Sequence, residues 1–403
     1  MSSDPSPLFT PLELPCGAVL SNRLAKAAMS DSLGDGMGNP TETQQRLYER
    51  WAAGGVALSI IGEVQGNPNF AEKPGNLVLT DDANPDPFRA LARKGAGPST
   101  QLWLQLGHAG AMTHAPNDTP KGPSALDLEG LQCDAMTFAE VSALPDMFAG
   151  TARLSRELGF GGVEIHAAHG FLLSQFLSPL FNRRGDAYGG AVTNRMRLLL
   201  EVIEAVRSAV GPAFPIGVKL NATDQLEGGL TPADALEVVA ALEGSGVDLI
   251  DISGGTYFPG AASASDATAS GVYFLDFAEA ARTRTRIPLM VTGGFKTRDQ
   301  AIDAVVSGKT DIVGLARSLV LNPNLPRRWQ ASDFPRAGDI TFPRFDAPPE
   351  GGITAWYTMR MTELGQDSEG QDVDLPAAVK AYNERDAERT LLWRSRFGSG
   401  AGS

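Results

Sequence analysis

The stretch AMSDSLGDGMGNP, residues 28–40, decides between two α/β folds. It follows a short apolar run that is typical of a β-strand, and it is rich in glycine. A doubly wound nucleotide-binding sheet would carry a GxGxxG turn here, with a helix starting directly on the glycines. The next helix-like segment, TETQQRLYERWAAGG, instead starts at Thr41, after the glycines have ended. The spacing therefore disfavours the doubly wound sheet.

The rest of the chain alternates between strand-like and helix-like segments. Short apolar runs rich in β-branched residues are typical of buried parallel strands, and amphipathic stretches with cap residues and a terminal glycine separate them. Strands are predicted at Arg23–Met29, Val56–Val64, Thr100–Leu106, Gly162–Ala167, Ile216–Leu220, Asp248–Ile252, Leu289–Thr292 and Asp311–Leu315. Eight strands, each followed by a helix, predict an α/β fold of the TIM (β/α)8 barrel type.

The pattern changes after Trp329. Residues 331–349 are rich in Pro and Asp, and two helix-like segments follow, AWYTMRMTEL and LPAAVKAYNERDAERTLLWRSRF. We therefore expect a barrel over residues 1–330. Residues 331–403 are expected to form a C-terminal loop and helical extension, packed on the barrel or on a partner subunit.

Charge and cysteine content restrict the function classes. The net charge of −13 predicts a surface that repels nucleic acid and anionic membranes. Two cysteines are too few for a disulfide framework or an iron–sulfur cluster. The N-terminal segment MSSDPSPLFTPLEL lacks the regions of a signal peptide, and no apolar run approaches the ~18 residues of a membrane span. We expect a cytoplasmic protein and leave open whether it forms a homo-oligomer.

Active sites of barrels of this type lie at the carboxyl ends of the strands. Most side chains at the predicted strand ends are hydrogen-bond donors, and few are carboxylates, which suits an electron-rich or anionic ligand. The strand-end residues are Ala27–Met29, Ser30, Glu63, Val64, Gln105, Gly107, His108, His166, His169, Lys219, Asn221, Ser253–Tyr257, Gly293, Gly294, Ala316 and Arg317.

The last two strands end in MVTGGF and IVGLARS. Barrels commonly bind phosphate at this point through backbone N–H groups. Gly293 and Gly294 would let the backbone approach a phosphate, and Arg317 could bind it with two parallel hydrogen bonds. The alternative is that the glycines form tight turns and the arginine a surface ion pair.

His166 and His169 allow three interpretations. They could bind a metal, although no HExxH pattern and no acidic cluster accompany them. They could be polar residues satisfied by the neighbouring backbone, or paired neutral donors that hold a carbonyl oxygen. Lys219 is also ambiguous, because a strand-end lysine can form a Schiff base or serve as a fixed positive charge beside an anion.

These residues belong to longer motifs that resemble a known family. HAAHGFLLSQFLSPLFNRRGDAYGG, followed by NRMRLLLEVIEAVR, resembles the signature of the Old Yellow Enzyme family of FMN-dependent NAD(P)H:flavin oxidoreductases and ene-reductases. SNRLAKAAMS, LQLGHAG, GPSAL and DIVGLARSLVLNP resemble further segments of that family. Together the motifs cover roughly residues 8–329 in the family's order.

The resemblance implies an FMN-binding barrel and assigns roles to residues. The implied cofactor-binding positions are Ala27, Ala28, Met29, Ser30, Val64, Gln105, His166, Lys219, Gly293, Gly294, Ala316 and Arg317. Lys219 stands where the family has an arginine beside flavin N1 and O2, and the last four positions match the phosphate cradle. His166 and His169 match the pair that hydrogen-bonds the electron-withdrawing oxygen of the substrate.

The activity implied is ping-pong reduction of the C=C bond of an α,β-unsaturated carbonyl or nitro compound, with NADPH or NADH as hydride donor and transfer through flavin N5. Phe171 departs from the family, because many members have a proton-donating tyrosine there; Tyr257 is the substitute candidate. The alternative keeps the flavin in an NADH oxidase or quinone reductase with little ene-reductase activity. Two further hypotheses are a flavin-binding redox carrier and an aldolase that acts through Lys219.

Overall fold

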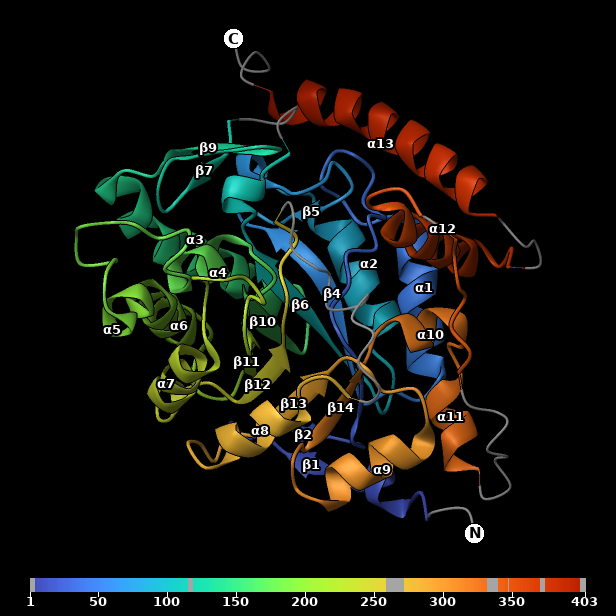
Figure 1. Ribbon diagram of the computed structural model, residues 1–403. Coiled ribbons are helices and arrows are strands. Elements are labelled where there is room, and N and C mark those ends of the chain that lie inside the picture. The colour runs from blue at the N-terminus through green and yellow to red at the C-terminus, as the bar shows by residue number, and fades with distance from the viewer. Residues whose placement is uncertain are drawn as a thin grey trace.

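Eight parallel strands close into a barrel (Figure 1). The computed structural model describes residues 4–114, 119–258, 272–331, 340–346, 348–369 and 374–398. The barrel strands are β3 (Leu24–Lys26), β4 (Leu58–Gln65), β6 (Gln101–Gly107), β10 (Gly162–Ala167), β11 (Ile216–Asn221), β12 (Leu249–Ser253), β13 (Leu289–Thr292) and β14 (Ile312–Leu315). Neighbouring strands pair in parallel, and the pairings of β3 with β14 and with β4 close the ring. The predicted TIM barrel and its eight strands are confirmed.

Helices surround the barrel on its outer side (Figure 1). They are α1 (Glu42–Ala53), α2 (Pro85–Gly95), α3 (Phe138–Glu157), α4 (Leu172–Leu177), α5 (Val192–Arg195), α6 (Arg197–Val210), α7 (Pro232–Leu242), α8 (Leu275–Arg282), α9 (Arg298–Val306), α10 (Arg317–Leu321), α11 (Leu325–Gln330), α12 (Gly352–Gln366) and α13 (Leu375–Phe397). Side chains cap several of them, and Thr41 accepts from the backbone N–H of Gln44 at the start of α1. The glycine-rich segment therefore ends at a helix cap, as the spacing predicts.

Short elements that the sequence pattern did not predict complete the barrel. The strands β1 (Leu12–Glu13) and β2 (Val19–Leu20) pair antiparallel, and Leu14 and Leu20 pack against the lower end of the barrel interior. Near the opposite end lie β5 (Leu77–Val78) and a small sheet of β7 (Lys121–Gly122), β8 (Leu126–Leu128) and β9 (Leu131–Ala135). Single 3-10 turns cover Ser6–Phe9, Pro68–Phe70 and Gly110–Met112.

Two layers of side chains fill the barrel. The lower layer is apolar and centres on Trp103, which is fully buried. Gly162 on the neighbouring β10 and Gly217 on β11 make room for its indole, since a Cβ would lie 2.6 Å from the ring at Gly162 and 3.2 Å at Gly217. The upper layer is polar and consists of Gln105, Glu164, Lys219, Asp251 and Thr292. Residues two apart on one strand point to the same face of the sheet. A strand that contributes to both layers therefore changes from an apolar residue to a polar one over two positions.

The C-terminal helices pack on the barrel of their own chain. Arg46 on α1 donates a hydrogen bond of 2.7 Å to the Gly365 carbonyl oxygen at the end of α12. Helix α13 lies across the end of the barrel away from β1 and β2 (Figure 1). Its Trp393 is buried against Ala71 and Val78, and its Arg389 donates to the Ser32 carbonyl oxygen. Helix α13 is therefore anchored to the loops that follow β3 and β4.

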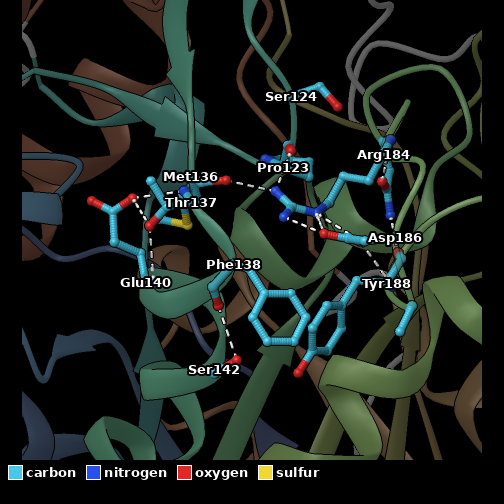
Figure 2. Close-up of polar contacts among 12 residues, drawn as sticks. Pro123, Ser124, Met136, Thr137, Phe138, Glu140, Ser142, Arg184, Asp186 and Tyr188 are labelled. Atoms are coloured by element: carbon cyan, nitrogen blue, oxygen red, sulfur yellow. Dashed lines mark hydrogen bonds and ion pairs between the residues drawn. The ribbon is translucent and has the colours of Figure 1, made fainter.

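The loop that follows α4 is tied to the small sheet (Figure 2). Arg184 donates from Nη1 to the carbonyl oxygens of Pro123, at 2.9 Å, and Met136, at 2.6 Å, while its Nε donates to Asp186. At the adjacent start of α3, Thr137 and Glu140 form a reciprocal capping box. These contacts hold the loop after α4, and α4 in turn follows the histidine pair.

Candidate active site

His166 and His169 lie together at the carboxyl end of β10, with ring centroids 5.2 Å apart. His169 adopts a left-handed backbone conformation, with φ of 60°, and Gly170 follows with φ of 80°. The Asn221 side-chain oxygen accepts from the His169 backbone N–H at 3.1 Å, and the Ser253 hydroxyl lies 2.9 Å from His169 Nε2. Three neighbouring strands thus hold the pair in one orientation.

The two imidazoles are neutral hydrogen-bonding groups. Removal of water around the ring, with the charge of Lys219, lowers the pKa of His169 to about 3. Burial, His169 and Lys219 hold the pKa of His166 well below its usual range. Nδ1 of His166 accepts from the Ala168 backbone N–H at 3.4 Å, which assigns the proton to Nε2. Among the described residues, no group of three His, Cys, Asp or Glu side chains could hold a metal ion.

Phe171 and Tyr257 stand on either side of the histidines. Phe171 is buried at the N-cap of α4, and its ring centroid lies 4.9 Å from that of His166. Tyr257 follows β12; its ring lies 5.8 Å from that of His169 and 6.0 Å from that of Phe171. Tyr257 is 56% exposed, unlike Phe171 at 2%. The structure therefore brings both aromatic candidates to the histidine pair.

The polar upper layer of the barrel lies directly below the two histidines. Lys219 and Asp251 form a fully buried ion pair, and Thr292 Oγ1 donates to Asp251 Oδ1 at 2.7 Å. Burial lowers the pKa of Lys219, but Asp251 and Glu164 outweigh this effect and the net pKa is raised. Gln105 donates to Glu164 at 2.7 Å. The sequence pattern identified Lys219 and Gln105 but missed both carboxylates, although each lies two residues before a strand-end polar residue.

Glu164 is a carboxyl group without a full set of partners. Its Oε2 atom is buried and makes no hydrogen bond among the described residues. Burial raises its pKa to about 8, against the opposing effect of Lys219. Glu164 is therefore mostly protonated at neutral pH. The ion pair within this layer is the one between Lys219 and Asp251.

The segment after β3 lies close to β4. Ala27, Ala28, Met29 and Ser30 follow one another there, and a Cβ on Gly62 would lie 2.3 Å from the Met29 carbonyl oxygen. Val64, by contrast, directs its side chain into the outer core, because a bulge between Ile61 and Val64 shifts the register of β4. The backbone, rather than the Val64 side chain, is thus available at this position.

The bulge also creates a carboxyl pair. Glu63 has φ of 59°, is 6% exposed and shares a hydrogen bond with the Glu72 carboxyl group. Burial and Glu72 raise the pKa of Glu63 well above its usual range. Glu63 was recognised as a strand-end residue, but nothing in the spacing indicated Glu72, which comes from the following loop.

The ends of β13 and β14 lie side by side. Gly293 and Gly294 both have positive φ, of 122° and 85°. Ala316 and Arg317 begin α10, and the Arg317 guanidinium lies over the rings of Phe342 and Tyr357. Among the described residues, no hydrogen bond or ion pair of Arg317 was found besides these ring contacts. Phe342 and Tyr357 lie in the C-terminal region, and the sequence pattern did not connect them with this end of the barrel.

Comparison with known proteins identifies the family. Residues 7–333 match the NADH:flavin oxidoreductase / NADH oxidase family. The NADH-dependent flavin oxidoreductase iliE of Hypocrea jecorina (strain QM6a) is 33% identical over 86% of this chain and 95% of its own. The NADH oxidase of Thermoanaerobacter brockii is 30% identical over 77% of this chain and 48% of its own.

A solved structure agrees with this assignment. Morphinone reductase superposes with a TM-score of 0.70 and 26% identity, over 80% of this chain and 89% of its own. None of the described helices has both the length and the apolar composition of a membrane span. The chain therefore belongs to the NADH:flavin oxidoreductase, or Old Yellow Enzyme, family and is an NAD(P)H-dependent flavin oxidoreductase.

Proposed function

We propose that the protein is an FMN-dependent ene-reductase that reduces the C=C bond of α,β-unsaturated carbonyl or nitro compounds with NADH or NADPH. The observation that carries this proposal is the pair of neutral histidines at the barrel mouth. A redox carrier would need no such anchor for a substrate oxygen. Residues 1–330 would form the FMN-binding barrel, and residues 331–403 the extension.

The residues present fit FMN. Gln105 and Lys219 offer donors to the pyrimidine edge of a flavin, while Ala27, Ala28, Met29 and the backbone at Val64 offer a surface for its ring. Ser30 would lie near O4, and His166 beside the ring. Backbone N–H groups at Gly293, Gly294 and Ala316 and the available guanidinium of Arg317 suit the phosphate. When bound, FMN would supply the hydride-transfer chemistry that links the nicotinamide to the alkene.

The histidines bind and activate the substrate. His166 Nε2 carries a proton that can be donated to a carbonyl or nitro oxygen. If Ser253 donates to His169 Nε2, Nδ1 of His169 becomes a second donor. Negative charge develops on the substrate oxygen as the β-carbon is reduced, and one such donor is typically worth about 3 kcal/mol. Because both pKa values are low, the pair donates without taking up charge itself.

Proton delivery to the α-carbon is assigned to Tyr257. Phe171 has no acidic hydrogen, and a general acid contributes about 10² to 10⁴ in rate. The Tyr257 ring lies close to both His169 and Phe171, and burial, Glu72 and Glu63 raise the pKa of its phenol, so that it carries its proton at neutral pH.

Phe171 also supports a second candidate, an NADH oxidase or quinone reductase with little ene-reductase activity. Electron transfer to oxygen or to a quinone needs no acid at position 171. The Thermoanaerobacter brockii relative carries the name NADH oxidase.

One experiment separates the two candidates. The FMN-loaded protein is reduced anaerobically with NADH or NADPH and then mixed with 2-cyclohexenone, while the flavin absorbance is followed. Prompt reoxidation by the enone supports the ene-reductase. Reoxidation only by quinone or air supports the second candidate, and a protein that cannot be loaded with FMN contradicts both.

A further inference from the structure

Lys219 is paired with a carboxylate inside the barrel. Lys219 and Asp251 are 1% and 0% exposed, and they lie on neighbouring strands in register with each other. Thr292 on the next strand donates to the Asp251 oxygen that faces away from the lysine. Asp251 is thus held as an anion by contacts on both of its oxygens.

The pair leaves the polar layer without net charge. Glu164 has a buried oxygen without a partner and is mostly protonated at neutral pH. Burial and the neighbouring Asp251 raise the pKa of Glu164, so that Asp251 is the carboxyl group that forms the ion pair with Lys219. The next buried lysine, Lys26, whose pKa burial lowers to about 7, donates to the Ile60 carbonyl oxygen and to Tyr48 on the outer side of β3. The net charge of the polar upper layer therefore depends on Asp251, which balances the charge of Lys219.

The balance matters for a cofactor that becomes more negative on reduction. Reduced flavin carries negative charge at N1, and an unbalanced buried cation would stabilise it far more than oxidised flavin, because charges interact strongly in a low-dielectric interior. A cation already paired with a carboxylate gives much less of this stabilisation.

We propose that Asp251 is a positioning residue that balances the charge of Lys219 and thereby keeps the reduction potential of the bound flavin low. This inference rests on the proposed function, in that FMN binds over Lys219. A low potential makes the reduced cofactor a stronger hydride donor toward an alkene.

The proposal requires that Asp251 act through Lys219. A buried carboxyl group that loses its cation takes up a proton, because desolvation disfavours its charged form. In a Lys219→Gln background there is no cation for Asp251 to balance, so its replacement by Asn should leave the flavin potential nearly unchanged.

The test is a double-mutant cycle of Asp251 and Lys219. The quantity measured is the reduction potential of the bound FMN at pH 7, obtained by equilibration with a reference dye. Asp251→Asn should shift the equilibrium at least tenfold toward reduced flavin, a rise of about 30 mV for a two-electron couple. The Lys219→Gln variant and the double variant should have redox equilibria of the bound FMN that agree within twofold. The proposal is overturned if the redox equilibrium of the Asp251→Asn variant lies within twofold of that of the unmodified protein. It is also overturned if Asp251→Asn causes the same shift in the unmodified protein and in the Lys219→Gln variant.

Two further variants make the test specific. Asp248→Asn removes another buried, ion-paired carboxylate just before the same strand, where Asp248 contacts Arg207, and it should leave the potential unchanged. Thr292→Val removes the hydroxyl that stabilises the Asp251 anion and should shift the equilibrium about twofold to fivefold in the same direction. If Asp251→Asn does not fold, an unshifted Thr292→Val protein contradicts the proposal.

Failure of the proposed function gives a different result. Unmodified protein that binds no FMN contradicts the function and this inference together. Unmodified protein that binds FMN and reduces enones, with an Asp251→Asn potential that does not move, contradicts only the role of Asp251.

Discussion

The lower and upper layers of the barrel are built by the same strands, two residues apart, yet they are chemically opposite. Trp103, Leu249 and Met290 form an apolar layer, whereas Gln105, Asp251 and Thr292, one step further along the same strands, form a polar one. Burial of apolar surface stabilises the fold. A buried ion pair is by contrast weak evidence for stability, because desolvation offsets the attraction. The lower layer therefore contributes more to the stability of the barrel than the upper layer does.

The largest effect is expected in the lower layer. Trp103→Ala should lower the free energy of unfolding by about 3–5 kcal/mol, because Gly162 and Gly217 cannot fill the space left by the indole. The measurement is denaturant unfolding followed by circular dichroism. The flavin potential of the folded fraction should stay unchanged; a large shift would mean that the layers are not separable.

The second effect concerns the histidines above the polar layer. His166→Ala should weaken binding of a phenol to the FMN-loaded protein by about 10² to 10³, the usual cost of one oxyanion donor. Titration of the flavin absorbance with the phenol measures this, and the FMN content should not fall. His114→Ala, outside the pair, is the control. Unchanged phenol affinity in both His166→Ala and His169→Ala would rule out the anchor.

A third effect should appear at Phe171. Phe171→Tyr places a phenolic proton beside His166 and should raise enone turnover, by roughly tenfold if protonation limits the rate. Rapid-mixing measurement of flavin reoxidation by 2-cyclohexenone tests this. Tyr257→Phe should lower the same rate. An unchanged rate in Phe171→Tyr would mean that proton delivery is not limiting.

The smallest effect concerns pH, because the imidazoles of His166 and His169 are expected not to titrate near neutral pH. An ordinary histidine has a pKa near 6.5, but His166 and His169 have strongly lowered values, with that of His169 about 3. Their imidazole NMR signals should not move between pH 5 and 8. Since the unfolded chain binds protons on these residues below pH 6.5 and the folded chain does not, they should lower stability as the pH falls from 6.5 toward 3. A midpoint above pH 5 for either ring would contradict a buried neutral pair.

The sequence predicted the barrel well, because its buried parallel strands are continuous apolar runs such as Leu289–Thr292. It also placed His166, His169 and Tyr257 at strand ends, where the structure brings them together. The roles of these residues stay predictions. Strands of two residues such as β1 and β7 carry too short a pattern to be recognised.

Pairings between strands were beyond the sequence. Nothing in the local pattern around Lys219 shows that Asp251, 32 residues later, lies beside it. The partner depends on register, which the closed barrel determines as a whole. The same holds for Glu72, which meets Glu63 only because a bulge turns β4 at that point.

Closure of the barrel has a consequence for how the chain reaches this state. Strand β3 pairs with β14, so that the Arg23 side chain and the Asp311 carbonyl oxygen, 288 positions apart, form one hydrogen bond. During synthesis β3 leaves the ribosome long before β14 exists, and one of its backbone edges has no partner to pair with. Exposed strand edges invite association between chains, and contacts between distant residues slow folding. We therefore expect nascent chains to depend on chaperones until the eighth strand emerges.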